Sequence, residues 1–94
     1  MANYRISKEA EEDLRRIYRR GLMEFGEVQA DLYFNTMFDR FDELAERPQM
    51  YQAVDNIRTG YRRSVCGVDS IYYRIVNETV EIMRVLGHQD LHQL

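Results

Sequence analysis

Arginine is the residue type in the C-terminal half of the chain that is best suited to recognising a charged partner. Five arginines recur there at strand-like spacing: Arg58, Arg62, Arg63, Arg74 and Arg84. A guanidinium presents a planar fork of donors that matches carboxylates and phosphates. Residues 57–74 carry four arginines against one acid, although the 94-residue chain has a net charge of −3. We therefore expect a local cationic surface and no direct sequence-specific binding of nucleic acid.

The residues needed for catalysis are scarce around these arginines. Cleavage of a phosphodiester needs a base for the attacking hydroxyl and an acid for the leaving oxygen. No tyrosine follows Tyr73, and Lys8 is the only lysine of the chain. His88 has a suitable unperturbed pKa, but an isolated histidine at a strand end is more often a surface residue. His88 and His92 lie four apart without further ligands, so we expect no catalytic residue, metal or cofactor.

Two helices precede the arginine-rich half. A polar–apolar alternation predicts a short strand over residues 3–6, and Ser7 fits the N-cap of a first helix. A second helix is predicted over residues 27–46, and Pro48 prevents its continuation. Residues 47–57 are expected to form a loop. Three strands then follow, near residues 61–66, 69–76 and 79–86.

This element order predicts one small α+β domain over residues 1–94. The order is β-α-α-β-β-β, in two layers, with a helical hairpin packed on one face of a mainly antiparallel sheet. The other face of the sheet should remain partly open. The single cysteine, Cys66, excludes an internal disulfide and fits a reducing cytosol, so we expect a cytoplasmic protein. No stretch approaches the length of apolar sequence that a membrane span needs.

The predicted second helix has a wider apolar stripe than one buried face requires. Tyr33, Met37 and Phe41 occupy its centre, whereas Phe34 and Phe38 lie toward its edge. Phe34 and Phe38 could be peripheral core residues. They could also line an apolar groove for a partner helix.

Arg84 alternates with apolar residues along the predicted last strand. Ile82 and Leu86 should share its face of the sheet. An arginine among apolar neighbours needs an acceptor, and a carboxylate of a partner protein is one source. Arg74 follows two tyrosines, so a structural role and a binding role are both open for it.

Several short segments together resemble the RelE/ParE toxin superfamily, and its ParE branch more than its RelE branch. The most specific matches are Arg58-x-Gly60-Tyr61-Arg62 and Ile71-x-Tyr73-Arg74. The opening Tyr4-Arg5-Ile6-Ser7 and the run from Val80 to Leu86 with His88 are also similar to that family. The tail of many relatives is basic, whereas residues 89–94 contain no arginine.

The resemblance implies the toxin of a type II toxin–antitoxin system. A ParE-like toxin inhibits DNA gyrase without catalysis and is neutralised by a cognate ParD-like antitoxin with a ribbon-helix-helix part. Candidate target-binding residues are Arg58, Tyr61, Arg62 and Arg63. Candidate antitoxin-binding residues are Phe34, Phe38, Arg74 and Arg84.

Two alternatives remain open at the level of the sequence. The first is a RelE-like ribosome-dependent endoribonuclease that cuts messenger RNA with the same arginines. The second is an inactive toxin that retains only antitoxin binding. The sequence also leaves open whether gyrase is the target, which antitoxin binds, the stoichiometry of the complex and the role of the tail.

Overall fold

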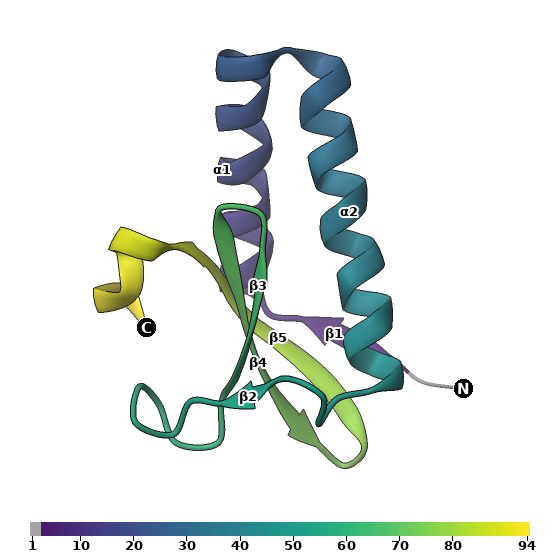
Figure 1. The fold of residues 1–94 in the computed structure, drawn as a ribbon, viewed down its shortest axis with the longest axis vertical. Helices are drawn as coiled ribbons and strands as arrows, with labels where there is room; N and C mark the ends of the chain where they lie inside the picture. Colours follow the sequence, from purple (N-terminus) through teal and green to yellow (C-terminus); the bar gives the residue numbers. More distant parts are fainter. Residues whose placement is uncertain (1–2) are drawn as a thin grey trace.

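The structure is a computed structural model that describes residues 3–94, without the side chain of Gln89. Within that range the elements are β1 Tyr4–Ile6, α1 Lys8–Phe25, α2 Glu27–Glu46, β2 Gln52–Ala53, β3 Arg62–Cys66, β4 Asp69–Val76, β5 Thr79–Gly87 and the 3₁₀ helix η1 His88–Gln93. The two helices run side by side, and the tip of their hairpin extends past the β3–β4 turn (Figure 1). The predicted α+β fold, a helical hairpin on a mainly antiparallel sheet, is confirmed.

The sheet contains one strand more than we predicted. Its order is β1-β5-β4-β3-β2, with β1 parallel to β5 and the other pairs antiparallel. β2 lies in the segment expected to be a loop, where Gln52 pairs with Arg63 and Ala53 with Arg62. Two exposed residues are too few to show a period-two alternation, so no local pattern predicts this strand.

The first helix begins where the sequence placed it. The hydroxyl of Ser7 accepts a hydrogen bond from the amide of Ala10 at 3.0 Å, which satisfies one of the free N–H groups of the first turn. The same hydroxyl donates to the carbonyl of Met83 at 2.9 Å. The N-cap of α1 therefore also fixes the start of this helix against β5.

The turn between β4 and β5 uses two residues with a left-handed backbone. Asn77 has φ +50° and Glu78 has φ +66°. Two successive positive φ values suit the tight hairpin turn whose twist matches that of the flanking strands. This turn sets the register of the two longest strands.

The main core lies between the helical hairpin and the sheet. Its buried members are Ala10, Leu14, Ile17, Met37, Phe41, Leu44, Cys66, Ile71, Tyr73, Val80, Ile82 and Val85. Phe41 and Tyr73 are fully buried at its centre. Alternation along β4 places Ile71 and Tyr73 toward the helices and Tyr72 on the opposite side.

A second apolar cluster covers part of the helix-free face of the sheet, the face that we expected to remain partly open. Val54, Tyr61, Tyr72 and Leu86 are buried in it. Leu91 and Leu94, in and after η1, pack against this cluster together with Ile57 and Met83. The covering residues come from the loop before β3 and from the segment after β5, so both faces of the sheet carry apolar contacts.

A bulge in β5 means that Ile82 and Leu86, which we expected to share one face of the sheet with Arg84, lie on opposite faces. Tyr72 pairs with Arg84 and the next residue, Tyr73, pairs with Ile82, so Met83 is an extra residue on β5. Such a bulge reverses the alternation of side chains. Ile82 therefore belongs to the main core, whereas Leu86 belongs to the second cluster.

Candidate partner-binding site

Two of the three candidate target-binding arginines donate hydrogen bonds within the fold. Arg58 is exposed; its Nη1 donates to the backbone oxygen of Leu94 at 2.7 Å, and its guanidinium lies 5.3 Å from the centre of the Tyr61 ring. The Nη1 of Arg62 donates to the carbonyl of Tyr51 at 2.7 Å. Arg62 is therefore partly structural, because it connects β3 to the loop that follows α2.

The other two candidates differ in accessibility. Tyr61 is only 6% exposed and belongs to the second cluster, so little of its ring is open to a partner. Arg63 is half-buried and lies beside Tyr72 in the sheet register. Among residues 3–94 it makes no side-chain hydrogen bond or ion pair, which leaves its guanidinium available for an external acceptor.

Arg74 belongs to an exposed ion-pair network on the sheet. Its Nε donates to Glu81 at 2.7 Å, and Arg5 donates to the same carboxylate at 2.8 Å. The hydrogen bond from Arg74 is the main cause that lowers the pKa of Glu81, with further Coulombic attraction from both arginines. Two arginines share one carboxylate, so the network carries a net positive charge.

Arg84 finds a carboxylate within the chain, so it does not require one from a partner protein. Its Nε and Nη2 donate to the two carboxylate oxygens of Asp13 at 2.7 and 3.0 Å. This bidentate contact raises the pKa of Arg84. Asp13 is 5% exposed and also accepts the backbone N–H of Val85 at 3.0 Å. The pair therefore attaches α1 to β5.

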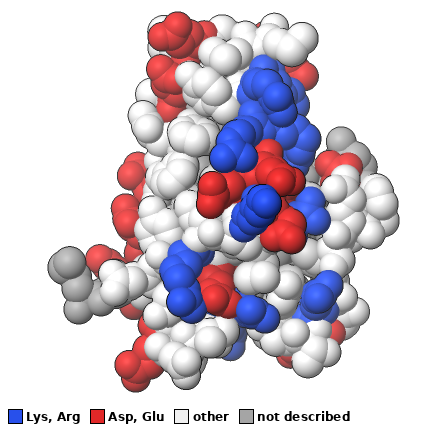
Figure 2. All heavy atoms as spheres, turned by 180° about the vertical axis from the view of Figure 1, so that it is seen from behind, with Lys and Arg blue, Asp and Glu red and all other residues white. Residues whose placement is uncertain are grey.

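Ion pairs of this kind place positive and negative side chains next to one another on the surface. Figure 2 shows positive and negative side chains intermixed over the face of the molecule that is seen from behind. Arg5, Arg74 and Glu81 form one such group, and Asp13 with Arg84 forms another. Within residues 57–74, the charge of Arg74 is therefore partly offset by Glu81 of β5.

Phe34 and Phe38 are half-buried members of an aromatic row. The Phe34 ring lies 5.3 Å from that of Tyr18 and 5.0 Å from that of Phe38, and Phe38 lies 5.1 Å from Phe41. These spacings are typical of favourable aromatic pairs. The edges of the row are open, so both predicted roles, peripheral core and apolar contact surface, are compatible with the placement.

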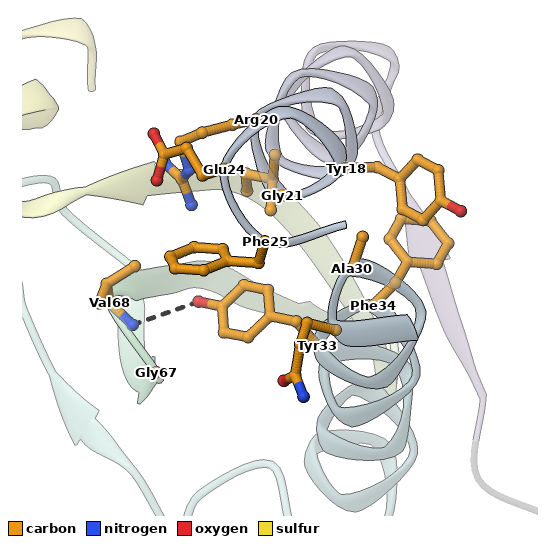
Figure 3. Close-up of a pocket in the computed structure, with 12 residues that line it drawn as sticks. Tyr18, Arg20, Gly21, Glu24, Phe25, Ala30, Tyr33, Phe34, Gly67 and Val68 are labelled. Carbon is orange, nitrogen blue, oxygen red and sulfur yellow. Dashed lines mark hydrogen bonds between the residues drawn. The ribbon is translucent and has the colours of Figure 1, made fainter. Parts of the chain in front are cut away.

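A pocket near the tip of the helical hairpin was not predicted. It has a volume of about 370 Å³ and lies between the hairpin and the β3–β4 turn. Phe25, Tyr33 and Phe34 are among its apolar walls, and Val68 stands at one side (Figure 3). Phe25 is 68% exposed and Val68 72% exposed. The sequence held one sign of this pocket: the apolar Phe25 precedes Gly26 and lies outside the apolar stripe of either helix.

A hydrogen-bonded network supports this pocket. The hydroxyl of Tyr33 accepts the N–H of Val68 at 3.2 Å (Figure 3). The same hydroxyl donates to the buried carboxylate of Asp69 at 2.8 Å. Arg20 donates to the same oxygen of Asp69 at 3.0 Å. Burial is the largest cause that raises the pKa of Tyr33, followed by its bond to Asp69. The network joins both helices to the β3–β4 turn.

Between residues 3 and 94 no three His, Cys, Asp or Glu side chains converge on a place for a metal ion. None of the helices in that range combines the length and the apolar character needed to cross a membrane.

Solved structures with this arrangement define the class of protein. A chain from the chromosomal ParDE TA system of P. aeruginosa superposes with a TM-score of 0.81 at 17% identity, over 93% of this chain and 96% of that one. A chain of the toxin–antitoxin complex RelBE2 from Mycobacterium tuberculosis gives a TM-score of 0.61 at 23% identity, over 93% and 98%. A mutant of YafQ from E. coli gives 0.64 at 13%, over 97% and 98%. The fold is that of the RelE/ParE toxins.

Sequence comparison identifies the family within that class. Residues 4–92 match the family described as "ParE toxin of type II toxin-antitoxin system, parDE". The chain is 38% identical to Toxin ParE1 of Caulobacter vibrioides over 92 residues, which cover 98% of this chain and 94% of that protein. It is 33% identical over 89 residues to Toxin ParE1 of Mycobacterium tuberculosis, covering 94% and 90%. The chain belongs to the ParE toxin family of type II toxin–antitoxin systems, as the sequence resemblance indicated.

Proposed function

We propose that this ParE-type toxin inhibits DNA gyrase without catalysis and is neutralised by a cognate ParD-like antitoxin with a ribbon-helix-helix part. The observation that carries the proposal is the match of residues 4–92 to the ParE toxin family. Identity of 38% over nearly the whole of a ParE1 toxin supports it. Family membership supports the choice of target, because fold alone does not define an activity.

The surroundings of the sheet tyrosines support a non-catalytic mechanism. Tyr61, Tyr72 and Tyr73 are each at most 6% exposed. The hydroxyl of Tyr73 donates to the carbonyl of Pro48 at 2.7 Å, and burial raises its pKa to about 12. A general base must reach its substrate and ionise near the working pH. Tyr73 meets neither condition, and Tyr61 and Tyr72 are too buried to reach a substrate.

The proposed contacts lie on two parts of the molecule. Gyrase would meet the candidates around the start of β3, which are Arg58, Tyr61, Arg62 and Arg63. Among these, Arg63 has the freest guanidinium and Tyr61 contributes mainly packing. The antitoxin would lay an apolar helix along Phe34 and Phe38 and place acids near the networks of Arg74 and Arg84.

The likeness to the RelBE2 and YafQ structures favours a second candidate, a RelE-like ribosome-dependent endoribonuclease. Both give lower TM-scores than the ParDE structure, 0.61 and 0.64 against 0.81. The arginines would then contact RNA phosphates. An inactive toxin that only binds its antitoxin is the third candidate.

Two assays run in parallel test these candidates. Purified toxin is added to gyrase in a supercoiling reaction and to translating ribosomes charged with messenger RNA. We expect supercoiling to stop and the messenger to remain intact, and we expect the cognate antitoxin to restore supercoiling. Codon-specific cleavage at sub-stoichiometric toxin would establish the RelE-like candidate instead. Inactivity in both assays, together with tight antitoxin binding, would indicate the inactive toxin.

A further inference from the structure

The pocket near the tip of the helical hairpin has the size of a site for a small molecule. Its volume is about 370 Å³, and small-molecule pockets range from roughly 300 to 1,000 Å³. Two small residues, Gly21 of α1 and Ala30 of α2, are part of its lining (Figure 3). A Cβ atom on Gly21 would lie 3.2 Å from that of Ala30, so a larger residue at either position would fill this space.

Four aromatic rings line the pocket. They belong to Tyr18, Phe25, Tyr33 and Phe34 (Figure 3). Hydrogen bonds of the Tyr33 hydroxyl with Asp69 and with the amide of Val68 hold one of these rings in place. The face of an aromatic ring carries partial negative charge and attracts a cation within about 6 Å of the ring centre. Several rings around one space are typical of sites that bind ammonium groups.

The charged groups at the pocket leave a negative balance. Arg20 lines the pocket, but its Nη2 already donates to the carboxylate of Asp69 at 3.0 Å. Glu24 also lines the pocket, and its side chain makes no hydrogen bond or ion pair among residues 3–94. Two acids therefore stand against one arginine, and the carboxylate of Glu24 is available for a positively charged ligand.

One buried oxygen next to the pocket lacks a hydrogen-bond donor. Asp69 is 1% exposed, and its Oδ2 accepts from Arg20 and Tyr33, whereas its Oδ1 has no partner among residues 3–94. Both donors line the pocket, so the incompletely satisfied carboxylate lies directly behind the lining. Charges interact more strongly where burial excludes water. A cation in the pocket would therefore stabilise Asp69, and an anion would be repelled by it.

We propose that this pocket binds a small aromatic amine, with the ring of the ligand against Phe25 and Tyr33 and its ammonium group beside Glu24. The free carboxylate, the aromatic lining and the surplus acid at Asp69 each favour a cation that carries an apolar body. The inference goes beyond the proposed function, because it concerns a ligand of the toxin alone and requires neither gyrase nor an antitoxin.

Titration of the full-length chain with a simple amine tests the site. The probe is 2-phenylethylamine, which is protonated at neutral pH, and the backbone amide signals of the isotope-labelled protein are followed by nuclear magnetic resonance. We expect saturable shifts at Gly21, Gly67 and Val68 with a Kd of about 1 mM, a free energy near −4 kcal/mol. The anion 3-phenylpropionate carries the same ring and should bind at least about fivefold more weakly, because its charge is repelled.

Matched variants separate the pocket from general attraction to the hairpin tip. Glu24→Gln should weaken binding of the amine by about threefold to fivefold, as for the loss of an exposed charge contact. Glu27→Gln removes an exposed acid that does not line the pocket and should leave the affinity unchanged. Phe25→Ala should weaken binding severalfold, whereas Met23→Ala, which is 88% exposed and outside the pocket, should not.

Three results would overturn the proposal. Shifts that show no saturation up to about 20 mM would mean that no site exists. Equal affinity for the amine and for 3-phenylpropionate would show that the ring alone is bound. Equal effects of Glu24→Gln and Glu27→Gln would place the attraction outside the pocket. Circular dichroism first shows that each variant is folded; if Phe25→Ala is not, Val68→Ser on the exposed β3–β4 turn replaces it with the same expected loss.

Discussion

At the residue scale, two buried carboxylates organise the contacts between helices and sheet. Asp13 accepts hydrogen bonds from Arg84 and from the amide of Val85, and Asp69 accepts them from Arg20 and Tyr33. An unpaired buried charge is strongly destabilising, so each carboxylate depends on its arginine. The sequence did not indicate that Asp13 pairs with Arg84 or that Asp69 pairs with Arg20.

We predict that Asp13→Ala lowers the free energy of unfolding by about 3 kcal/mol. The change leaves Arg84 and the N–H of Val85 without their acceptor, and breaking one partner of a buried ion pair typically costs about 3–5 kcal/mol. Urea unfolding followed by circular dichroism measures the effect. The control is Glu11→Ala, which removes an exposed pair with Arg15 and should cost less than about 1 kcal/mol. Equal costs for the two variants would contradict a structural role for Asp13.

We predict that the protein loses stability between about pH 10 and pH 12 partly because of Tyr73. Burial raises its folded-state pKa to about 12, whereas an unfolded tyrosine ionises near pH 10. The unfolded chain therefore loses this proton first, and stability that is complete below pH 10 falls as the pH rises toward 12. At pH 11 the loss from this group is about 1.4 kcal/mol. Tyr73→Phe should show a smaller decrease between pH 9 and pH 11 in thermal melts, whatever its stability at pH 9.

At the element scale, the turns between strands determine which side chains can approach one another. Gly67, with φ +63°, lets the β3–β4 turn come close to α2. A Cβ atom at this position would lie 2.7 Å from the hydroxyl oxygen of Tyr33, whereas at Gly60, with φ +84°, it would meet nothing within 4 Å. A side chain at Gly60 would therefore cause backbone strain alone, whereas a side chain at Gly67 would also crowd Tyr33.

We predict that Gly67→Ala is more destabilising than Gly60→Ala. Both substitutions place a Cβ in the left-handed region, at a cost of roughly 1–2 kcal/mol. Gly67→Ala also forces the Tyr33 ring away from Asp69, and such overpacking adds about 1–3 kcal/mol. Chemical unfolding of both variants gives the comparison. Equal destabilisation would mean that the Tyr33 ring moves aside freely.

We predict that Phe38→Ala weakens binding of the cognate antitoxin by roughly thirtyfold. Truncation of a large aromatic anchor at an interface typically costs about 2 kcal/mol or more, and about 1.4 kcal/mol corresponds to a factor of ten. Titration calorimetry measures the affinity after circular dichroism has shown that the variant is folded. Asp39→Ala, one position further along α2 on its exposed side, is the control. Unchanged affinity for the folded Phe38→Ala variant would assign this ring to the core alone.

At the scale of the whole molecule, the folded surface has a different charge pattern from the linear sequence. Within the basic run of residues 57–74, Arg74 pairs with Glu81 of β5. Arg62 donates to the carbonyl of Tyr51, and Arg58 donates to the backbone oxygen of Leu94. Arg63 remains as the candidate whose charge is free for a target.

We predict that Arg63→Gln reduces gyrase inhibition by up to about fivefold and makes the residual inhibition less dependent on salt. An exposed charge contact contributes about 0.2–1 kcal/mol, and screening by salt acts on that contact. Supercoiling assays over a range of ionic strength measure both effects. Arg19→Gln on α1 has the same change of charge and should inhibit as the parent does. If the two variants behave alike, the contact surface lies elsewhere, on the helical hairpin or on residues 88–94.

The sequence alone determined the family and all the elements except the short strand β2 and the 3₁₀ helix η1. Ser7 as N-cap, the end of α2 before Pro48 and the turn at residues 77–78 depend on interactions within a few residues, so local patterns reveal them. The buried stripe of α2 follows from helical periodicity. The family resemblance rested on short segments whose order and spacing are themselves properties of the sequence.

Only the tertiary structure decided which distant groups meet. Asp13 and Arg84 are 71 positions apart, and their pairing depends on the packing of α1 against β5 beyond the end of β1. The bulge at Met83 separated Ile82 from Leu86, which simple alternation had placed together. Leu91 and Leu94 pack against the cluster of Tyr61 only because the chain folds back after β5. A local pattern states which face of an element is apolar, whereas register, bulges and packing determine what that face contacts.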